Sequence, residues 1–184
     1  VEEVGYEVVS DSVFSKISDT CTPQGVLCVL KQFHYNIEEM LRDKAPLFLL
    51  LENIQDPGNL GTMLRTGEGA GVSGIIMSRD TVDLYNPKVI RSTMGSIYRV
   101  PFYYADDFAA AVHQVQQAGV SVYAAHLRGK NSYACQDYTK GTAFLIGNEG
   151  NGLREETAEL ADCYIRIPME GKVESLNAAV ASSI

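Results

Sequence analysis

From Leu47 onward the sequence alternates between short apolar runs and segments with helical spacing, and this alternation is the strongest constraint on the fold. The runs expected to form strands are Leu47–Leu51, Gly74–Met77, Arg99–Tyr103, Val120–Ala125, Ala143–Gly147 and Cys163–Ile167. Strands that are apolar throughout and alternate with helices are typical of a parallel sheet covered on both faces. We therefore predict an α/β fold, with a mostly parallel sheet and helices on both of its faces.

Helix start and stop signals occupy the segments between the predicted strands. Asn59 is expected to cap a helix with the apolar face Leu60, Met63, Leu64 and Gly67. Asn86 followed by Pro87 begins the next helix, and Asp107 caps a further helix that Gly119 terminates. The last two helices are expected at Asn151–Ala161 and Glu174–Ile184.

Residues 1–44 differ from the rest of the chain. Val4–Ser10 and Gly25–Leu30 suggest a strand or two around a polar loop, and Asn36–Lys44 has helical or linker character. This is too little to bury a core alone. We expect a boundary near Lys44–Pro46. The first residue is not Met and the chain stops at Ile184 inside a predicted helix, which indicates a fragment of a longer protein.

Composition and charge restrict the possible functions. The hydrophobic fraction of 46% and charged fraction of 21% are those of an ordinary globular protein, and no apolar run reaches the roughly 18 residues of a membrane span. The four cysteines are scattered without a C-x-x-C pair, so we expect neither a metal site nor disulfides, and a cytoplasmic location. The net charge of -8 argues against a nucleic-acid partner, unless a local basic patch or a partner domain supplies positive surface.

The segment Gly69–Gly74 matches G-x-G-x-x-G, the fingerprint of dinucleotide-binding folds. That fingerprint works only where the glycines follow a strand and open a helix, because backbone amides at a helix N-terminus must meet a pyrophosphate. Here the glycines follow a predicted helix and precede a predicted strand. We interpret them as a helix stop and a tight turn, and we exclude a Rossmann oxidoreductase.

Three segments carry residues suited to chemistry. The first is a polar loop and helix start, Asn53–Arg65, which leaves the carboxyl end of the first core strand, where open α/β sheets bind ligands. It forms either a capped helix with a solvated Arg65 or part of a site. The second, Gly147–Leu153, places glycines around Glu149. It forms either a turn in which Glu149 serves a helix N-terminus or a loop that offers bare backbone to a flat ligand.

The third segment runs from Ile165 through Pro168 to the small-residue stretch after Asn177. Ser175 or Asn177 is expected to open that final helix, either as an ordinary N-cap or as part of a site. Its alanines allow the helix to pack closely against another backbone.

Together the three segments read N-x-x-D-P-x-N-x-G-x-x-x-R, I-G-N-E-G-x-G and I-P-M-x-G-x-x-x-S-L-N-A-A-V-A. This pattern resembles the SpoU (TrmH) family of RNA 2′-O-ribose methyltransferases, in the SPOUT superfamily, over about Leu47–Ile184. The resemblance implies that residues 45–184 form a methyltransferase domain, truncated at its C-terminus. Residues 1–44, with Lys16–Thr20 and Pro23–Val26, resemble the end of the family's N-terminal RNA-binding domain plus a linker.

The resemblance also implies a C-terminal trefoil knot, a homodimer, and S-adenosylmethionine as the cofactor. The cofactor-binding positions that it implies are Gly147, Ile167 and Leu176, with Ala125 at the end of the preceding strand. The positions that match the catalytic motifs are Arg65, Asn59, Glu149, Ser175 and Asn177. A guanidinium stays protonated in proteins, so we interpret Arg65 as holding phosphate and stabilising a developing alkoxide rather than as a base.

The implied activity is methylation of a ribose 2′-hydroxyl in structured RNA. The Lys16–Gly25 segment favours ribosomal RNA as the substrate. A tRNA ribose methyltransferase, or a non-catalytic RNA-binding module of the same fold, remains the alternative.

Overall fold

The computed structural model describes residues 5–18 and 20–184 of the chain. The chain divides into two units, Val1–Phe33 and His34–Ile184. In the first unit, helix α1 (Asp11–Ile17) begins where the Ser10 side chain accepts a hydrogen bond from the N–H of Val13. Asp11 in its first turn and Lys16 in its last turn both suit the helix dipole. None of its residues is buried.

The strands expected in this first unit are wrong for the residues that can be compared. Residues 5–10 and 25–30 form no strand, and Val4 lies outside the described residues. A helix occupies part of the segment expected to be a polar loop, because its Ser and Asp residues act as helix-capping residues there.

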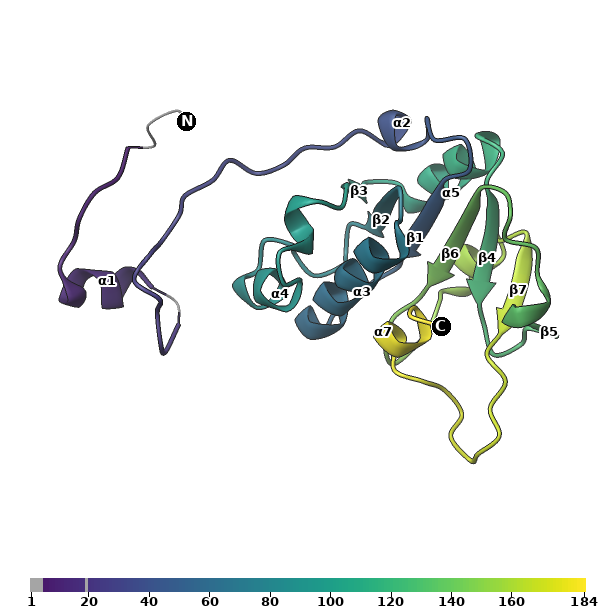
Figure 1. Cartoon of the computed structure of the whole chain (residues 1–184). Coiled ribbons are helices and arrows are strands. Elements are labelled where there is room, and N and C mark those ends of the chain that lie inside the picture. The colour runs from purple at the N-terminus through teal and green to yellow at the C-terminus, as the bar shows by residue number, and fades with distance from the viewer. Residues whose placement is uncertain (1–4, 19) are drawn as a thin grey trace. The chain divides into compact units, whose positions relative to one another are not determined.

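The second unit is built on a seven-stranded sheet in the order β3-β2-β1-β6-β4-β7-β5 (Figure 1). Its strands are β1 (Leu47–Leu51), β2 (Gly74–Ser78), β3 (Phe102–Ala105), β4 (Ser121–Ala125), β5 (Asn131–Ser132), β6 (Thr142–Ile146) and β7 (Cys163–Arg166). Every pair of neighbouring strands is parallel. The chain proceeds from β1 outward to β3, then returns to build the other half from β4. The direction in which successive strands are added to the sheet therefore reverses beside β1. Open α/β sheets bind ligands at such a reversal.

Helices cover both faces of this sheet, as predicted. One face packs against α2 (Ile37–Met40), α5 (Phe108–Gln117) and α6 (Glu155–Ala158) around Phe48, Leu50 and Leu145. The opposite face packs against α3 (Pro57–Ala70), which buries Leu60, Met63, Leu64 and Gly67. Helices α4 (Pro87–Ser92) and α7 (Ala178–Ala181) flank α3. Short 3-10 turns, η1 (Ser96–Tyr98) and η2 (Tyr133–Cys135), complete the unit. Strand β5 and turn η2 were not predicted.

Several cap predictions are confirmed and one is wrong. Asn86 accepts from the N–H of Lys88, and Asp107 accepts from the N–H of Ala110. Gly119 has a φ of +84°, as a helix-terminating glycine does. Asn59, however, is not a cap. Helix α3 begins three residues earlier than predicted, because Pro57 suits its first turn and the Asp56 side chain accepts from the N–H of Asn59.

The G-x-G-x-x-G segment is a helix stop, as interpreted. Helix α3 ends at Ala70, Gly71 has a φ of +74°, and β2 starts at Gly74. The third strand lies later than expected, at Phe102–Ala105 rather than Arg99–Tyr103. The reason is that Arg99 terminates η1 and Pro101 has no N–H to donate to a strand.

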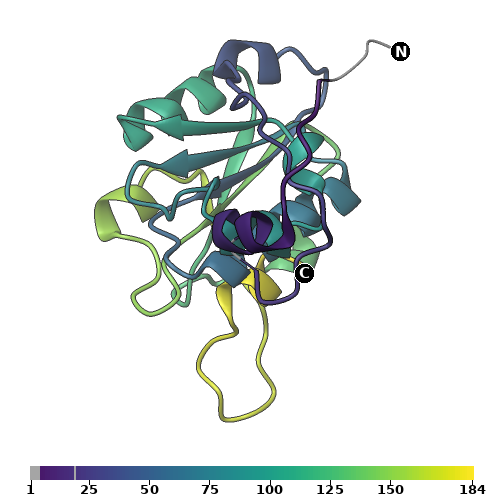
Figure 2. The same ribbon diagram turned by 90° about the vertical axis from the view of Figure 1, so that its left-hand side faces the viewer.

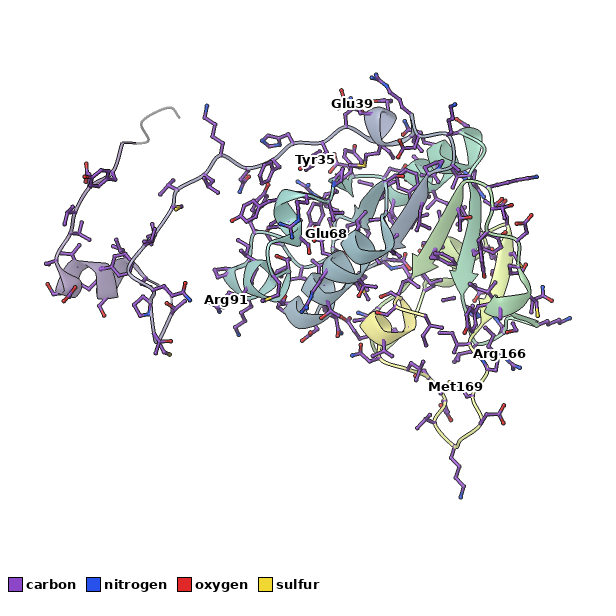
Figure 3. The ribbon with its side chains drawn as sticks, viewed as in Figure 1. Tyr35, Glu39, Glu68, Arg91, Arg166 and Met169 are labelled. Carbon is purple, nitrogen blue, oxygen red and sulfur yellow. The ribbon has the colours of Figure 1, made fainter. Side chains whose placement is uncertain are left out.

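The last two helices are shorter than predicted. Residues 148–152 form a bridged turn, in which the N–H of Asn148 donates to the carbonyl of Gly152 and the reverse bond also forms, so α6 starts only at Glu155. Helix α7 begins at Ala178, because the Asn177 side chain accepts from the N–H groups of Ala179 and Val180. The segment from β7 to α7 projects from the sheet (Figures 1 and 2) and carries Met169 at its start (Figure 3).

Candidate active site at the carboxyl edge of the sheet

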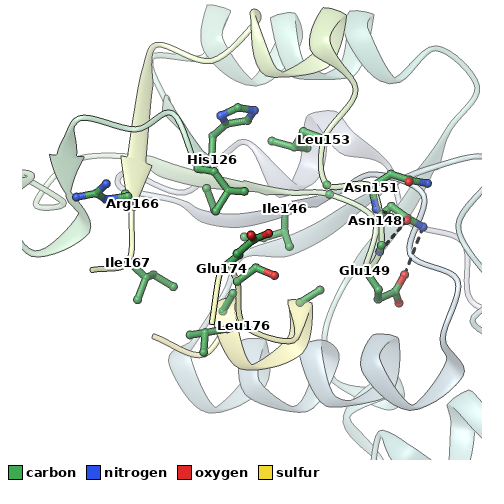
Figure 4. Close-up of a pocket in the computed structure, with 18 of the residues that line it drawn as sticks. His126, Ile146, Asn148, Glu149, Asn151, Leu153, Arg166, Ile167, Glu174 and Leu176 are labelled. Atoms are coloured by element: carbon green, nitrogen blue, oxygen red, sulfur yellow. Dashed lines mark hydrogen bonds between the residues drawn. The ribbon is translucent and has the colours of Figure 1, made fainter. Parts of the chain in front are cut away.

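A pocket of about 260 Å³ lies at the carboxyl ends of strands β4, β6 and β7 (Figure 4). The strands end there together because they are parallel. The pocket wall includes Ile146 and the glycine-rich loop that follows β6, which we name the cofactor loop (Gly147–Leu153). Its other side is formed by the segment that follows β7 and by the start of α7. The four positions implied to bind cofactor, Ala125, Gly147, Ile167 and Leu176, all line it.

The cofactor loop is folded tightly on itself. A Cβ atom at Gly147 would lie 2.2 Å from both the carbonyl carbon of Gly152 and the nitrogen of Leu153, so only glycine fits. The side-chain oxygen of Asn148 accepts from the N–H groups of Gly150 and Asn151, at 3.0 Å each. This turn presents backbone atoms and small residues to the pocket, as expected for recognition of a flat ligand.

Glu149 points out of the cofactor loop toward the polar loop after β1. This loop belongs to a motif that the family resemblance implies to be catalytic, and we therefore name it the catalytic loop (Asn53–Asp56). The Glu149 carboxylate accepts from the N–H of Gln55 at 3.1 Å and from the N–H of Asp56 at 3.0 Å. Burial alone would raise the pKa of Glu149, but the hydrogen bonds from Asp56, Asn59 and Gln55 outweigh it and hold the pKa below its ordinary value. Glu149 is therefore a fixed anion that ties the two loops together.

Residues from all three motifs are joined by hydrogen bonds through Asn59. The Asn59 Nδ2 donates to Glu149 Oε1 at 3.1 Å, and the Asn59 Oδ1 accepts from Asn177 Nδ2 at 3.0 Å. Because Asn177 also caps α7, the same side chain orders the final helix and contacts the first turn of α3. The structure thus brings together Glu149, Asn59 and Asn177, three of the five residues that match the catalytic motifs.

The remaining two lie apart from this chain of hydrogen bonds. Ser175 lines the pocket on the exposed segment before α7. Arg65 is exposed on α3, opposite that helix's buried face, and its side chain forms no ion pair or hydrogen bond within the described part of the chain. Its guanidinium therefore keeps its donors available for an external anion.

Sequence reasoning missed other residues of the pocket wall, among them His126 and Glu174 (Figure 4). Burial and the nearby Arg128 lower the pKa of His126. The centroid of its ring lies 5.0 Å from that of the Tyr164 ring. The position of His126 directly after β4 was the available signal, since carboxyl ends of parallel strands form the ligand edge.

The pocket fits the adenosyl cofactor that the resemblance implies. Ile146, Leu153, Ile167 and Leu176 offer apolar surface, and the glycine-rich turn offers backbone groups within the same small volume. A second, apolar cavity of about 430 Å³ lies beside it and shares Ala125, Ile146 and Ile167. The described residues that line the second cavity include no Asp, Glu, His, Lys or Arg, whereas the wall of the first includes His126, Glu149 and Glu174, so the candidate chemistry belongs to the first.

Two further observations concern the described residues alone. No cluster of three or more His, Cys, Asp or Glu side chains among them could hold a metal ion. None of their helices has the length and apolar character needed to cross a membrane.

The fold and the pocket define an α/β domain that binds a ligand at the carboxyl edge of a parallel sheet, between a glycine-rich loop and a short C-terminal helix. The family model described as SpoU rRNA Methylase family matches residues 46–184. The chain belongs to the SpoU rRNA methylase family.

Individual relatives agree with this assignment. The 23S rRNA (guanosine(2553)-2'-O)-methyltransferase RlmP of Bacillus subtilis (strain 168) is 34% identical over 177 residues, which cover 96% of this chain and 69% of that protein. An uncharacterized tRNA/rRNA methyltransferase of Synechocystis sp. is 34% identical over 180 residues, covering 96% of this chain and 64% of that protein. The chain thus spans about two thirds of the length of these relatives.

A solved structure gives the same result in three dimensions. The AdoMet-bound rRNA methyltransferase from Sinorhizobium meliloti superimposes with a TM-score of 0.85 at 35% identity, covering 95% of this chain and 67% of that one. The α/β fold expected from the sequence is confirmed.

Proposed function

We propose that this chain is the catalytic part of an S-adenosylmethionine-dependent RNA methyltransferase that modifies a ribose 2′-hydroxyl, with ribosomal RNA as its substrate. The observation that carries the proposal is the hydrogen-bonded series Glu149–Asn59–Asn177, which joins all three family motifs beside the pocket. The presence of all three side chains, in mutual contact, argues against a non-catalytic module.

S-adenosylmethionine, when bound, supplies a methyl group on a positively charged sulfur. Within the pocket, Ile167 and Leu176 give apolar contact and the Gly147 backbone allows close approach. Ser175 lies on the same wall, at the end that leads toward Asn177 and Asn59. These residues would hold and orient the cofactor, and the binding energy comes from apolar contact and a few placed polar groups.

The ribose hydroxyl must be aligned with the methyl group, and its oxygen gains negative charge as its proton passes to solvent water. The uncommitted guanidinium of Arg65 is suited to hold an RNA phosphate and to stabilise that charge. Glu149 is not suited to act as a base, because its carboxylate is occupied by the catalytic loop and by Asn59. Its role is to fix the shape of the site.

The choice of ribosomal RNA rests on the relatives, of which one is named a 23S rRNA guanosine methyltransferase and another a tRNA/rRNA methyltransferase. A tRNA ribose is the alternative substrate, and a non-catalytic RNA-binding module is the alternative of another class. A homodimer, a cytoplasmic location and a C-terminal trefoil knot are parts of the same proposal that follow from the family.

The test is transfer of a labelled methyl group from S-adenosylmethionine to total RNA, followed by mapping of the modified nucleotide. Label in a ribose of 23S RNA supports the proposal, and label in tRNA favours the alternative substrate. Calorimetry with S-adenosylmethionine identifies a non-catalytic module, which would bind no cofactor and transfer no label.

A further inference from the structure

Glu52, the residue that follows β1, is a buried carboxylate outside the chain of motif residues described above. Its side chain is 1% exposed. One oxygen accepts from the backbone N–H of Arg154 at 2.8 Å, and the other accepts from the hydroxyl of Thr157 and, at 3.5 Å, from the Arg154 guanidinium. Arg154 directly follows the cofactor loop and Thr157 lies in α6. Glu52 therefore holds the end of the cofactor loop against the end of β1.

Arg154 extends this contact to a second carboxylate. Its Nη2 forms an ion pair with Asp80, which follows β2, and the Arg154 and Asp80 side chains are 48% and 41% exposed. Burial alone would raise the pKa of Asp80, but hydrogen bonds from Ser78 and Arg154 outweigh it and lower the pKa. Asp80 is thus a stable anion opposite a fixed cation.

Asp80 is also connected to the catalytic loop by two sets of hydrogen bonds. Its carboxylate accepts from the Ser78 hydroxyl at 2.6 Å, and that hydroxyl oxygen accepts from the N–H of Asn53 at 2.8 Å. Its backbone carbonyl accepts from the side-chain amide of Gln55 at 2.6 Å. The end of the cofactor loop and the start of the catalytic loop are therefore connected through Arg154 and Asp80.

The beginning of the cofactor loop is held separately. The Asn148 side chain donates to the carbonyl of Asn53 at 2.8 Å (Asn148 is shown in Figure 4). Glycine-rich segments have many alternative conformations, so a loop containing Gly147, Gly150 and Gly152 keeps one shape only where both ends are held. Asn148 holds one end, and Glu52 and Arg154 hold the other.

We propose that Asp80 and Arg154 are positioning residues that keep the cofactor loop in its binding shape and couple it to the catalytic loop. The inference rests on the proposed function, because it takes S-adenosylmethionine as the ligand of the pocket. Neither residue lines the pocket. They act through the loop and do not touch the ligand.

A loop that binds only in one conformation has an apparent affinity reduced by the fraction of time that it spends in the others. Weakening the Arg154–Asp80 pair lowers the population of the binding shape in the free protein. Once the cofactor is bound, the loop is held by the ligand, and the following step proceeds as before. The expected signature is a raised Kd and KM for S-adenosylmethionine with an unchanged kcat.

The most informative variant is Asp80→Asn, in the full chain. It removes the charge that faces Arg154 but leaves Arg154 bonded to Glu52, so no buried carboxylate loses its partner. We expect the Kd for S-adenosylmethionine, measured by calorimetry, to rise about three- to tenfold, which is the range for losing one charged hydrogen bond at a half-exposed site. Arg154→Lys keeps the positive charge but cannot span both carboxylates, and it should show the same direction.

The matched control is Asp106→Asn. Asp106 pairs with Arg79, the neighbour of Asp80, at 3.5 Å. The Arg79 side chain is 72% exposed and the Asp106 side chain 89% exposed, and this pair is not connected to the two loops. The control should leave Kd, kcat and thermal stability unchanged. Thermal unfolding of Asp80→Asn separates a loop effect from general loss of structure.

The inference is overturned if Asp80→Asn binds S-adenosylmethionine as tightly as Asp106→Asn does, or if kcat falls while Kd stays the same. A parent chain that binds no S-adenosylmethionine at all refutes the proposed function instead. The two failures are therefore distinguishable in one series of titrations.

Discussion

Asn59 and Glu149 stand 90 positions apart in the sequence, yet the side-chain amide of Asn59 donates to the Glu149 carboxylate at 3.1 Å. The pairing requires that β1 and β6 be neighbours in the sheet, because each residue follows one of those strands. It also requires that α3 begin at Pro57, so that Asn59 lies in the first turn and faces the cofactor loop. The site is therefore a product of strand order together with one helix start.

Arg65→Ala should lose methyl transfer while keeping cofactor affinity. The guanidinium is exposed and lies outside the pocket lining, so its removal leaves the cofactor contacts in place. We expect turnover to fall about a hundredfold or more, the usual cost of losing a group that stabilises developing charge. Labelled transfer to RNA and calorimetry with S-adenosylmethionine measure the two effects. Arg79→Ala is the control on an exposed arginine away from the site, and turnover equal to the control would refute the role of Arg65.

Glu149→Gln should weaken the hydrogen bonds that connect the cofactor loop to the catalytic loop. The amide retains the shape of the side chain but loses the charge that the Gln55 and Asp56 N–H groups contact. Hydrogen bonds to charged groups are the stronger kind, so we expect a stability loss of about 1 kcal/mol and a reduced kcat. Thermal unfolding and single-turnover transfer provide the measurements. A variant with native turnover would show that the charge of Glu149 is dispensable.

The same variant has a pH signature. The pKa of Glu149 is lowered from its ordinary value of 4.5, so its charged form is favoured by folding. The stabilisation is fully present above about pH 4.5 and disappears as the pH falls through the folded-state pKa below it. The difference in unfolding free energy between the parent chain and Glu149→Gln should therefore be constant near neutral pH and shrink in acid. A difference that grows as the pH falls below 4.5 would contradict the assignment.

Gly147→Ala should damage the pocket, whereas Gly150→Ala in the same loop should not. The added methyl at 147 would lie 2.2 Å from backbone atoms of Gly152 and Leu153, while at 150 the nearest atom is Asn148 Oδ1 at 3.6 Å. We expect Gly147→Ala to cost about 1–3 kcal/mol, the range for overpacking, and to weaken S-adenosylmethionine binding. Calorimetry on both variants tests this directly. Equal affinities would show that the loop adapts to the extra methyl.

Gly61→Ala and Gly69→Ala form a second matched pair, on helix α3. A methyl at 61 would lie 1.8 Å from the Ser92 hydroxyl of α4, and one at 69 meets nothing within 4 Å. Gly61→Ala should therefore lower stability by about 1–3 kcal/mol. Gly69→Ala should raise it by up to about 1 kcal/mol, because alanine favours the helix. Denaturant unfolding measures the change in stability of both variants. Changes of the same sign would contradict the close packing of α3 against α4.

Local pattern was enough to predict much of the molecule. The apolar runs predicted β1 fully and the other long strands within a few residues, and the reversed order of glycines and strand excluded a dinucleotide fingerprint. Local pattern failed at the starts of two helices. Asp56 caps α3 instead of Asn59, and the bridged turn of the cofactor loop delays α6 to Glu155.

The sequence by itself determined the α/β class and the identity of the three motifs, because residue spacing and turn chemistry are local properties of the chain. Only the tertiary structure decided that β6 lies between β1 and β4, which brings Asn59, Glu149 and Asn177 into contact. It alone paired Arg154 with Glu52 and Asp80. Such pairs depend on which strand ends are neighbours, and that order is set by packing of the whole sheet.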